Sequence, residues 1–236
     1  MRSDAYNIDC LEYMRALPDK YFDLAIADPP YGINADRDQM HRSGKRFGHQ
    51  AAKCRDYGVS DWDREAPGKE FFIELCRVSQ HQIIWGANHF IENIPSPNAS
   101  CWIVWDKETG DNSYADCELA WTSLPGAVRK FRYKWHGMIQ ENMANKEERI
   151  HPTQKPVSLY GWLIGKYAPS GGVIFDPMMG SQSSRIAAYK MGFDYVGCEL
   201  DKEYFAKGCE RFNQECLGEY VTKQGTVIKE QDLFDL

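Results

Sequence analysis

The chain has 236 residues, of which 43% are hydrophobic and 26% charged, and its net charge is −6. This length suits one α/β domain with a full core, and the composition excludes a disordered or fibrous chain. Nothing approaches the roughly 20 apolar residues of a membrane span, and the start lacks the apolar core of a signal peptide. We therefore expect a cytoplasmic protein with no membrane partner. The acidic balance excludes overall basicity, but a local basic patch would still allow nucleic-acid binding.

The eight cysteines allow disulfides or zinc, but none forms a Cys-x-x-Cys pair and several lie inside apolar runs. Buried free thiols are the favoured interpretation. No metal site is expected.

The opening predicts a strand at 6–8, a helix at 9–17 begun by the capping residue Asp9, and a buried strand at 22–27. Two prolines in Asp28-Pro29-Pro30-Tyr31 then forbid continuation as a ladder or a helix. This places a carboxylate, a rigid carbonyl and an aromatic ring at the carboxyl edge of the sheet, where ligands bind in open α/β folds. The competing interpretation is a strand stop with Tyr31 as a packing residue.

Residues 33–66 form a long loop with few aliphatic side chains and several cations, among them Arg42, Lys45 and Arg46. Loops of this length are uncommon unless functional or mobile. We favour a substrate-facing loop over a solvated excursion, because it starts at the expected active edge.

Regular structure resumes with a helix at 69–80 and strands at 82–86, 101–105 and 118–123. In the stretch that follows, rings alternate with the cations Arg129, Lys130, Arg132 and Lys134. This pattern suits an exposed edge strand and equally suits contacts to phosphates and unstacked bases. Both interpretations stay open.

The last third predicts helices at 157–167, 184–191 and 201–216 and strands at 172–175 and 195–198. A turn of small residues, 175–184, joins a buried strand to a helix and would let a ligand approach the backbone. Glu199, at the end of the next strand, is placed to accept both hydroxyls of a ribose. Together these features predict an adenosine-containing cofactor.

Three stretches resemble signature motifs of the S-adenosylmethionine-dependent DNA amino-methyltransferases: Asp28-Pro29-Pro30-Tyr31-Gly32, His151-Pro152-Thr153-Gln154-Lys155-Pro156 and the 175–184 turn. Their order resembles the beta-type members, and Trp85-Gly86-Ala87-Asn88 and Trp105-Asp106-Lys107 resemble short phage and prophage forms. The resemblance implies a Rossmann-like methyltransferase fold: a mostly parallel seven-stranded sheet flanked by helices, with circularly permuted motif order. It also implies a single domain over 1–236, with target-recognition segments at 33–66 and 125–150 and a short tail at 217–236.

The resemblance also assigns residues. Asp28, Pro29, Pro30 and Tyr31 would be catalytic, and Arg42, Lys45, Arg46, Arg129, Lys130, Arg132 and Lys134 are the candidates for DNA contact. Asp9 and Cys10 would lie by the adenine of the cofactor, Glu199 by its ribose, and Thr153, Gln154 and Lys155 over its carboxylate. The full expected cofactor set is Asp9, Cys10, Asp28, Thr153, Gln154, Lys155, Asp176, Met178, Gly180, Ser181, Gln182, Ser183 and Glu199. Gln182 departs from the glycine usual in the family, and its side chain would crowd the cofactor or shift the turn.

The function implied is methyl transfer from S-adenosylmethionine to the N6 amino group of a flipped adenine in duplex DNA, leaving S-adenosylhomocysteine. The open alternatives are cytosine N4 methylation, a DNA-binding homologue with impaired catalysis, and RNA or protein amide methylation. A homodimer is expected from the family. The terminal Gln231-Asp232-Leu233-Phe234 loosely resembles peptides that bind the bacterial replication clamp.

Overall fold

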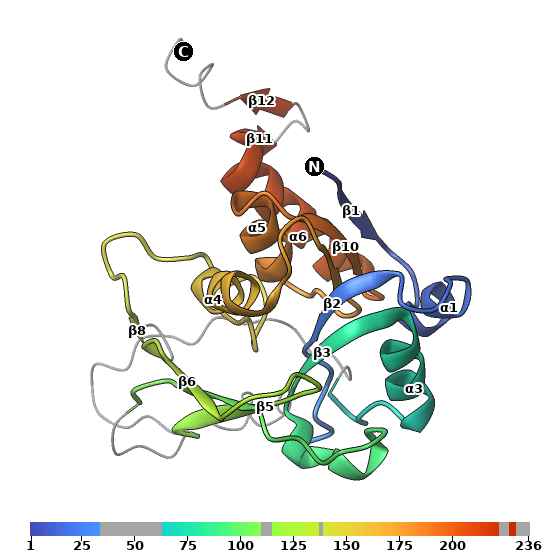
Figure 1. The fold of residues 1–236 in the computed structure, drawn as a ribbon. Coiled ribbons are helices and arrows are strands. Elements are labelled where there is room, and N and C mark those ends of the chain that lie inside the picture. Colours follow the sequence, from blue (N-terminus) through green and yellow to red (C-terminus); the bar gives the residue numbers. More distant parts are fainter. Residues whose placement is uncertain (34–62, 110–114, 137–138, 222–226, 230–236) are drawn as a thin grey trace.

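The computed structural model describes residues 1–33, 63–109, 115–136, 139–221 and 227–229 (Figure 1). Its centre is one eight-stranded sheet. In sheet order the strands are β1 (Ser3–Tyr6), β10 (Asp194–Cys198), β9 (Val173–Asp176), β2 (Phe22–Ala27), β3 (Ser79–Trp85), β5 (Cys117–Thr122), β4 (Trp102–Asp106) and β6 (Arg129–Arg132).

The first five strands of this order run parallel, β5 runs antiparallel to both of its neighbours, and β6 pairs in parallel with β4. The expected mostly parallel Rossmann-like sheet is confirmed, but the expected count of seven strands is one too few. The additional strand is β6, the basic and aromatic stretch. Phe131 packs its ring on Trp162 with centroids 5.3 Å apart, while Lys130 and Arg132 face solvent, so the strand has one apolar side.

Helices cover both faces of the sheet (Figure 1). On one face lie α1 (Cys10–Arg15) and α3 (Lys69–Val78), whose apolar side chains form one core with Phe22, Phe175 and Val196. On the other face, α4 (Val157–Tyr167) and α5 (Ser183–Lys190) pack on Leu24, Ile26 and Ile174. None of the helices in the described part of the chain is long and apolar enough to cross a membrane.

The remaining elements are short or peripheral. Helix α6 (Lys202–Phe212) continues into a π-helical turn (Asn213–Leu217), and 3-10 turns occupy Ala87–His89 and Ile91–Asn93. Two small antiparallel ribbons pair β7 (Trp135–His136) with β8 (Ile139–Gln140) and β11 (Glu219–Val221) with β12 (Val227–Lys229).

The expected strand at 6–8 is wrong, because β1 ends at Tyr6. Beyond it, the Asn7 amide donates to the backbone carbonyls of Glu199 (2.8 Å) and Leu200 (3.0 Å), so the chain leaves the ladder. Asp9 then caps α1 as expected, accepting from the backbone N–H groups of Leu11 and Glu12.

The described cysteines are free thiols, as expected, and three of them (Cys10, Cys101 and Cys198) are buried. Cys117 is exposed, so the expectation of burial is wrong for that residue. Cys54, Arg42, Lys45 and Arg46 lie outside the described residues, as do most of 33–66 and the expected clamp peptide at 231–234.

The connections between strands change direction between the neighbouring strands β9 and β2. From β9 it proceeds through α5 to β10 on one side, whereas from β2 it proceeds through α3 to β3 on the other. Adjacent strands whose connections diverge in this way leave a crevice beyond their carboxyl ends, which is where open α/β sheets bind ligands. The two strands end in Asp176 and immediately before Asp28.

Candidate active site

The predicted site residues gather at one edge of the sheet. Ala27 pairs with Ile84 and Gly197 pairs with Asp176, so the parallel strands end nearly level. The strands are therefore followed at one edge by Asp28 after β2, Gly86 after β3, Pro177 after β9 and Glu199 after β10. The fold brings together the motifs that the sequence keeps far apart.

Asp28 faces a lysine from a distant segment. The Lys155 ammonium donates to Asp28 Oδ1, and the Tyr31 hydroxyl lies 3.0 Å from the same oxygen. The Asp28 side chain is 17% exposed and that of Lys155 only 2%. Burial raises the pKa of Asp28, and the positive charge of Lys155 opposes that rise. The resemblance placed Lys155 over the cofactor's carboxylate, whereas here it is the countercharge of Asp28.

A second carboxylate completes this cluster. Glu118, on β5, accepts from Lys155 Nζ at 3.1 Å and lies 3.2 Å from the Tyr31 hydroxyl, and its other oxygen pairs with Lys107. Burial raises the pKa of Glu118, but the ammonium groups of Lys155 and Lys107 outweigh burial and lower that pKa to about 2. Glu118 therefore stays ionised and holds Lys155 in place.

The Tyr31 ring is held by its surroundings. Asp63 accepts from the backbone N–H groups of Tyr31 (2.7 Å) and Gly32 (3.0 Å), which fixes the turn after the prolines. The ring stacks on His89, with centroids 5.2 Å apart and planes 16° from parallel. A Cβ at Gly86 would overlap the Tyr31 ring, so the strand end must be glycine there.

Asp176 begins the second turn of the site and is buried. It accepts from the backbone N–H of Met178 (3.0 Å) and from the hydroxyl of Ser184 (2.6 Å). Burial raises the pKa of Asp176 to about 7, because those hydrogen bonds compensate only in part. Both of its oxygens are engaged in shaping the turn.

Glu199 reaches the same turn from β10. Its carboxylate accepts from the backbone N–H groups of Gly180 and Asp201, each at 2.8 Å. A Cβ built at Gly180 would meet only the His151 ring, at 4.0 Å, so the backbone there is open to close approach. Glu199, which the sequence predicts to bind a ribose, thus adjoins an accessible turn.

Gln182 does not crowd this space. Its backbone is left-handed (φ 61°), which explains why glycine suits the position, but its side chain packs against α6. Its amide oxygen accepts from Arg185 (2.9 Å), and its amide nitrogen donates to the Phe205 carbonyl (3.3 Å). Gly208 leaves the room, since a Cβ there would lie 2.7 Å from the Gln182 side chain.

Other predicted cofactor residues have partners within the protein. Gln154 is buried and braces the preceding loop, accepting from Ile150 N–H (2.9 Å) and donating to the Glu148 carbonyl (2.9 Å). Thr153 is exposed beside His151. The Ser181 and Ser183 hydroxyls lie 3.2 Å apart.

A cavity of about 310 Å³ lies where the adenine is expected. Its lining includes Asp9, Cys10, Phe71 and Met178. An aromatic ring, a thioether and a thiol suit the faces of a purine, and Asp9 supplies an acceptor. This lining, together with Gly180 and Glu199 on the same edge of the sheet, fits an adenosine-containing cofactor.

The described DNA candidates lie on and after β6. Lys130 Nζ is 3.4 Å from Asp106, and Arg132 pairs with Glu108 and, at 3.9 Å, with Asp106. Both side chains are more than half exposed. Arg129 is also exposed, and Lys134 donates its backbone N–H to Glu141. The cations face solvent, but nearby acids partly neutralise two of them.

The N6/N4 DNA methylase family model matches residues 97–209, which include the 151–156 motif, the 175–184 turn and Glu199. Over these residues the chain is similar to the N6/N4 DNA methylases. It is 24% identical to the type II methyltransferase M.HinfI of Haemophilus influenzae over 245 residues, covering 83% of this chain and 64% of the relative. The type II methyltransferase M2.MboI of Moraxella bovis is also 24% identical, over 249 residues, covering 89% of this chain and 87% of that one.

Among solved structures, the chain resembles TTHA0409 of Thermus thermophilus, described as a candidate DNA modification methylase and solved in complex with S-adenosyl-L-methionine. The TM-score is 0.57 at 18% identity, and the match covers 91% of this chain and 95% of the other. This likeness agrees with the Rossmann-like sheet. The chain spans just under two thirds of the length of the Haemophilus influenzae relative.

Sequence reasoning missed several residues of this site. Glu118 was assigned only to a strand, Lys107 only to a short motif, and Asp63 and His89 to no role. The sequence offered one signal on β5. Glu118 directly precedes the apolar run 119–121, and an acid next to a buried strand needs a partner of opposite charge or a hydrogen bond.

Proposed function

We propose that this chain methylates the N6 amino group of adenine in duplex DNA, using S-adenosylmethionine. The observation that carries the proposal is the half-buried carboxylate of Asp28 next to the fixed carbonyl of Pro29, at the same sheet edge as the adenosine-compatible turn. The match of residues 97–209 to the N6/N4 DNA methylase model supports methylation of an exocyclic amine. Aspartate at the first motif position favours adenine over cytosine by resemblance.

Each residue has a role that follows from its chemistry. An exocyclic amine is a weak nucleophile, because its lone pair is delocalised into the ring. Hydrogen bonds from that amine to Asp28 and to the Pro29 carbonyl favour a pyramidal nitrogen, and the fixed φ of proline keeps its carbonyl preorganised. Lys155, held by Glu118, favours the carboxylate form of Asp28 that accepts these bonds.

The cofactor supplies an electrophilic methyl group on sulfur. The amine nitrogen would bond to that carbon as the carbon–sulfur bond breaks and its electron pair stays on sulfur, and the nitrogen would then release a proton to water. Asp9, Cys10, Gly180 and Glu199 would hold the cofactor, so that positioning provides most of the rate. The target base must leave the duplex to reach the pocket. One face of Tyr31 is covered by His89, so a base that stacks on that face displaces the imidazole.

The function is tested by incubating the purified chain with duplex DNA and methyl-labelled S-adenosylmethionine, then digesting the DNA to nucleosides. We expect label in N6-methyldeoxyadenosine. Label in N4-methyldeoxycytidine would move the assignment to the other chemistry of the family. Label in RNA but not in duplex DNA, when both are offered in competition, would contradict the substrate class.

The impaired-homologue alternative rested on Gln182. Since that side chain packs on α6, it gives no reason for lost cofactor binding. Calorimetry decides between the two, because the impaired homologue binds no S-adenosylmethionine even at millimolar concentration. The beta-type and phage-like assignments, the homodimer and the clamp contact stay predictions.

A further inference from the structure

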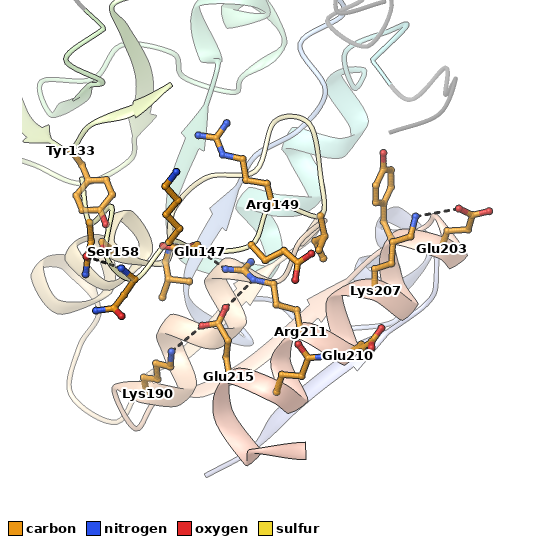
Figure 2. Close-up of a pocket in the computed structure, with 18 residues that line it drawn as sticks. Tyr133, Glu147, Arg149, Ser158, Lys190, Glu203, Lys207, Glu210, Arg211 and Glu215 are labelled. Atoms are coloured by element: carbon orange, nitrogen blue, oxygen red, sulfur yellow. Dashed lines mark hydrogen bonds and ion pairs between the residues drawn. The ribbon is translucent and has the colours of Figure 1, made fainter. Parts of the chain in front are cut away.

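Arg211, on α6, is a buried cation that the reaction described above does not use. It is 5% exposed, and its guanidinium lines a second cavity, of about 1150 Å³, between α6 and the chain that precedes α4 (Figure 2). Other cations of this cavity pair on its surface, Lys190 with Glu215 at 3.0 Å and Lys207 with Glu203 at 3.5 Å. Arg211 instead points inward, toward two different segments.

On one side Arg211 binds the 175–184 turn, here called the cofactor turn because it is the expected cofactor site. Its Nη1 donates to the Ser181 carbonyl (3.0 Å) and to the Ser183 hydroxyl (2.8 Å). Its Nε donates to Glu215 at 3.0 Å on the same helical stretch, which keeps the guanidinium oriented. A planar guanidinium with several fixed donors sets both distance and angle, so the backbone of the turn is fixed relative to α6.

On the other side Arg211 holds Glu147. Its Nη2 donates to the Glu147 carboxylate at 2.9 Å, and Figure 2 shows the two side chains meeting across the cavity. The same carboxylate accepts from the backbone N–H of Val157 (3.0 and 3.2 Å), at the start of α4 and just after Lys155. The Gln140 side-chain amide makes two hydrogen bonds to the backbone of Glu147: it accepts from the N–H (2.8 Å) and donates to the carbonyl (2.9 Å).

We propose that Arg211 is a positioning residue that couples the segment carrying Glu147 to the cofactor turn, so that cofactor affinity depends on a contact made away from the cofactor. The inference rests on the proposed function, because it takes the 175–184 turn as the cofactor site. Glu147 lies in the 125–150 segment expected to contact DNA. Arg211 therefore links the expected DNA side of the molecule to the cofactor side.

The test is a double-mutant cycle of Glu147→Gln and Ser183→Ala in the full chain, read by calorimetric titration with S-adenosylmethionine. Glu147→Gln removes the charge from one contact of Arg211 and Ser183→Ala removes another contact, and we expect each change to weaken binding about tenfold. Because both act through the same guanidinium, the double variant is expected to bind no more weakly than the worse single variant. The KM for the cofactor should rise in Glu147→Gln while kcat stays near wild type.

Two further variants separate positioning from general damage. Arg211→Lys keeps the charge and is expected to retain more affinity than Arg211→Met. Lys207→Met, on the same helix and in the same cavity but without contact to the turn, is the matched control and should bind like wild type. Wild-type affinity in Glu147→Gln, or fully additive losses in the cycle, would overturn the proposal.

Failure of the proposed function is distinguishable from failure of this inference. If the wild-type chain binds no S-adenosylmethionine, the proposed function fails. The four proteins of the cycle (wild type, Glu147→Gln, Ser183→Ala and the double variant) are then compared by urea unfolding. Non-additive losses of stability would still support the link through Arg211, whereas additive losses would refute it.

Discussion

Two neighbouring strands of this sheet carry the same dipeptide, Asp-Pro, at their carboxyl ends, but the two aspartates have different surroundings. Asp28-Pro29 follows β2 and Asp176-Pro177 closes β9, and the two strands pair directly. Asp28 is half-buried and faces Lys155, whereas Asp176 is buried and accepts hydrogen bonds from its own turn. The same residues therefore place an acid against a lysine at one strand end and a structural anchor at the other.

Charge makes the difference. Burial raises the pKa of both carboxyl groups. At Asp28 the ammonium of Lys155 opposes the rise, while at Asp176 a hydroxyl and a backbone N–H oppose it and the pKa still reaches about 7. A lysine from a distant motif thus opposes protonation of one acid, whereas the other acid binds its proton near neutrality.

The largest expected effect is on stability at Asp176. A carboxyl whose pKa is raised by folding binds its proton in the native state between about pH 4 and 7, so the free energy of unfolding falls as pH rises through this window. The full shift corresponds to about 4 kcal/mol. Asp176→Asn should flatten that dependence in urea unfolding at pH 5 and pH 8, with exposed Asp19→Asn as the control. An unchanged pH dependence would show that Asp176 does not titrate there.

Removing the countercharge should convert Asp28 toward the behaviour of Asp176. Lys155→Met takes away the charge that opposes the rise in the pKa of Asp28, so the carboxylate form is lost at higher pH than in wild type. We expect about a 10²-fold loss of kcat/KM at neutral pH. The acid limb of the pH profile of kcat/KM should move to higher pH. Lys155→Arg keeps the charge and should displace the limb less. An acid limb in the same place for all three proteins would exclude Lys155 as the countercharge.

The cofactor turn depends on α6 through the contact of Gln182 with Gly208. Gly208→Ala gains about 1 kcal/mol of helix propensity but introduces a Cβ 2.7 Å from Gln182, and overpacking costs about 1–3 kcal/mol. We expect a net loss of about 1 kcal/mol in urea unfolding. Adding Gln182→Gly to Gly208→Ala should recover stability, because it removes the clash and suits the left-handed backbone. A double variant less stable than Gly208→Ala would contradict this packing account.

The smallest effect is expected at the edge strand. Neutralising Arg129, Lys130 and Arg132 should weaken duplex binding and flatten the dependence of log K on log salt by about one to two units. The flattening should fall short of three full contacts, because Asp106 and Glu108 already pair with two of these cations. Lys69→Gln, at an exposed position of α3, is the control. An unchanged slope would remove β6 from the interface.

The sequence predicted the parts of the site that are local. Prolines after apolar runs placed Asp28 and Asp176 at strand ends, and the capping pattern placed Asp9 at the start of α1. Glu199 lies at the end of β10, beside Gly180, as its position after an apolar strand indicated.

What the sequence did not predict depends on long-range geometry. Lys155 was assigned to the cofactor, because nothing local shows that its ammonium reaches Asp28. Glu118 and Arg211 looked like ordinary charges on a strand and a helix, and their roles arise only when antiparallel β5 and helix α6 pack beside the two turns. The Gln182 side chain packs against α6 only because Gly208, 26 positions later in the sequence, has no Cβ that would clash with it.

The central claim is that Asp28 accepts the amine of the target base while a separate set of residues holds the cofactor. It is tested most directly by Asp28→Ala, with S-adenosylmethionine binding and methyl transfer to duplex DNA measured on the same preparation. The account predicts cofactor binding close to wild type with no detectable methyl transfer. Methyl transfer retained by Asp28→Ala would contradict it.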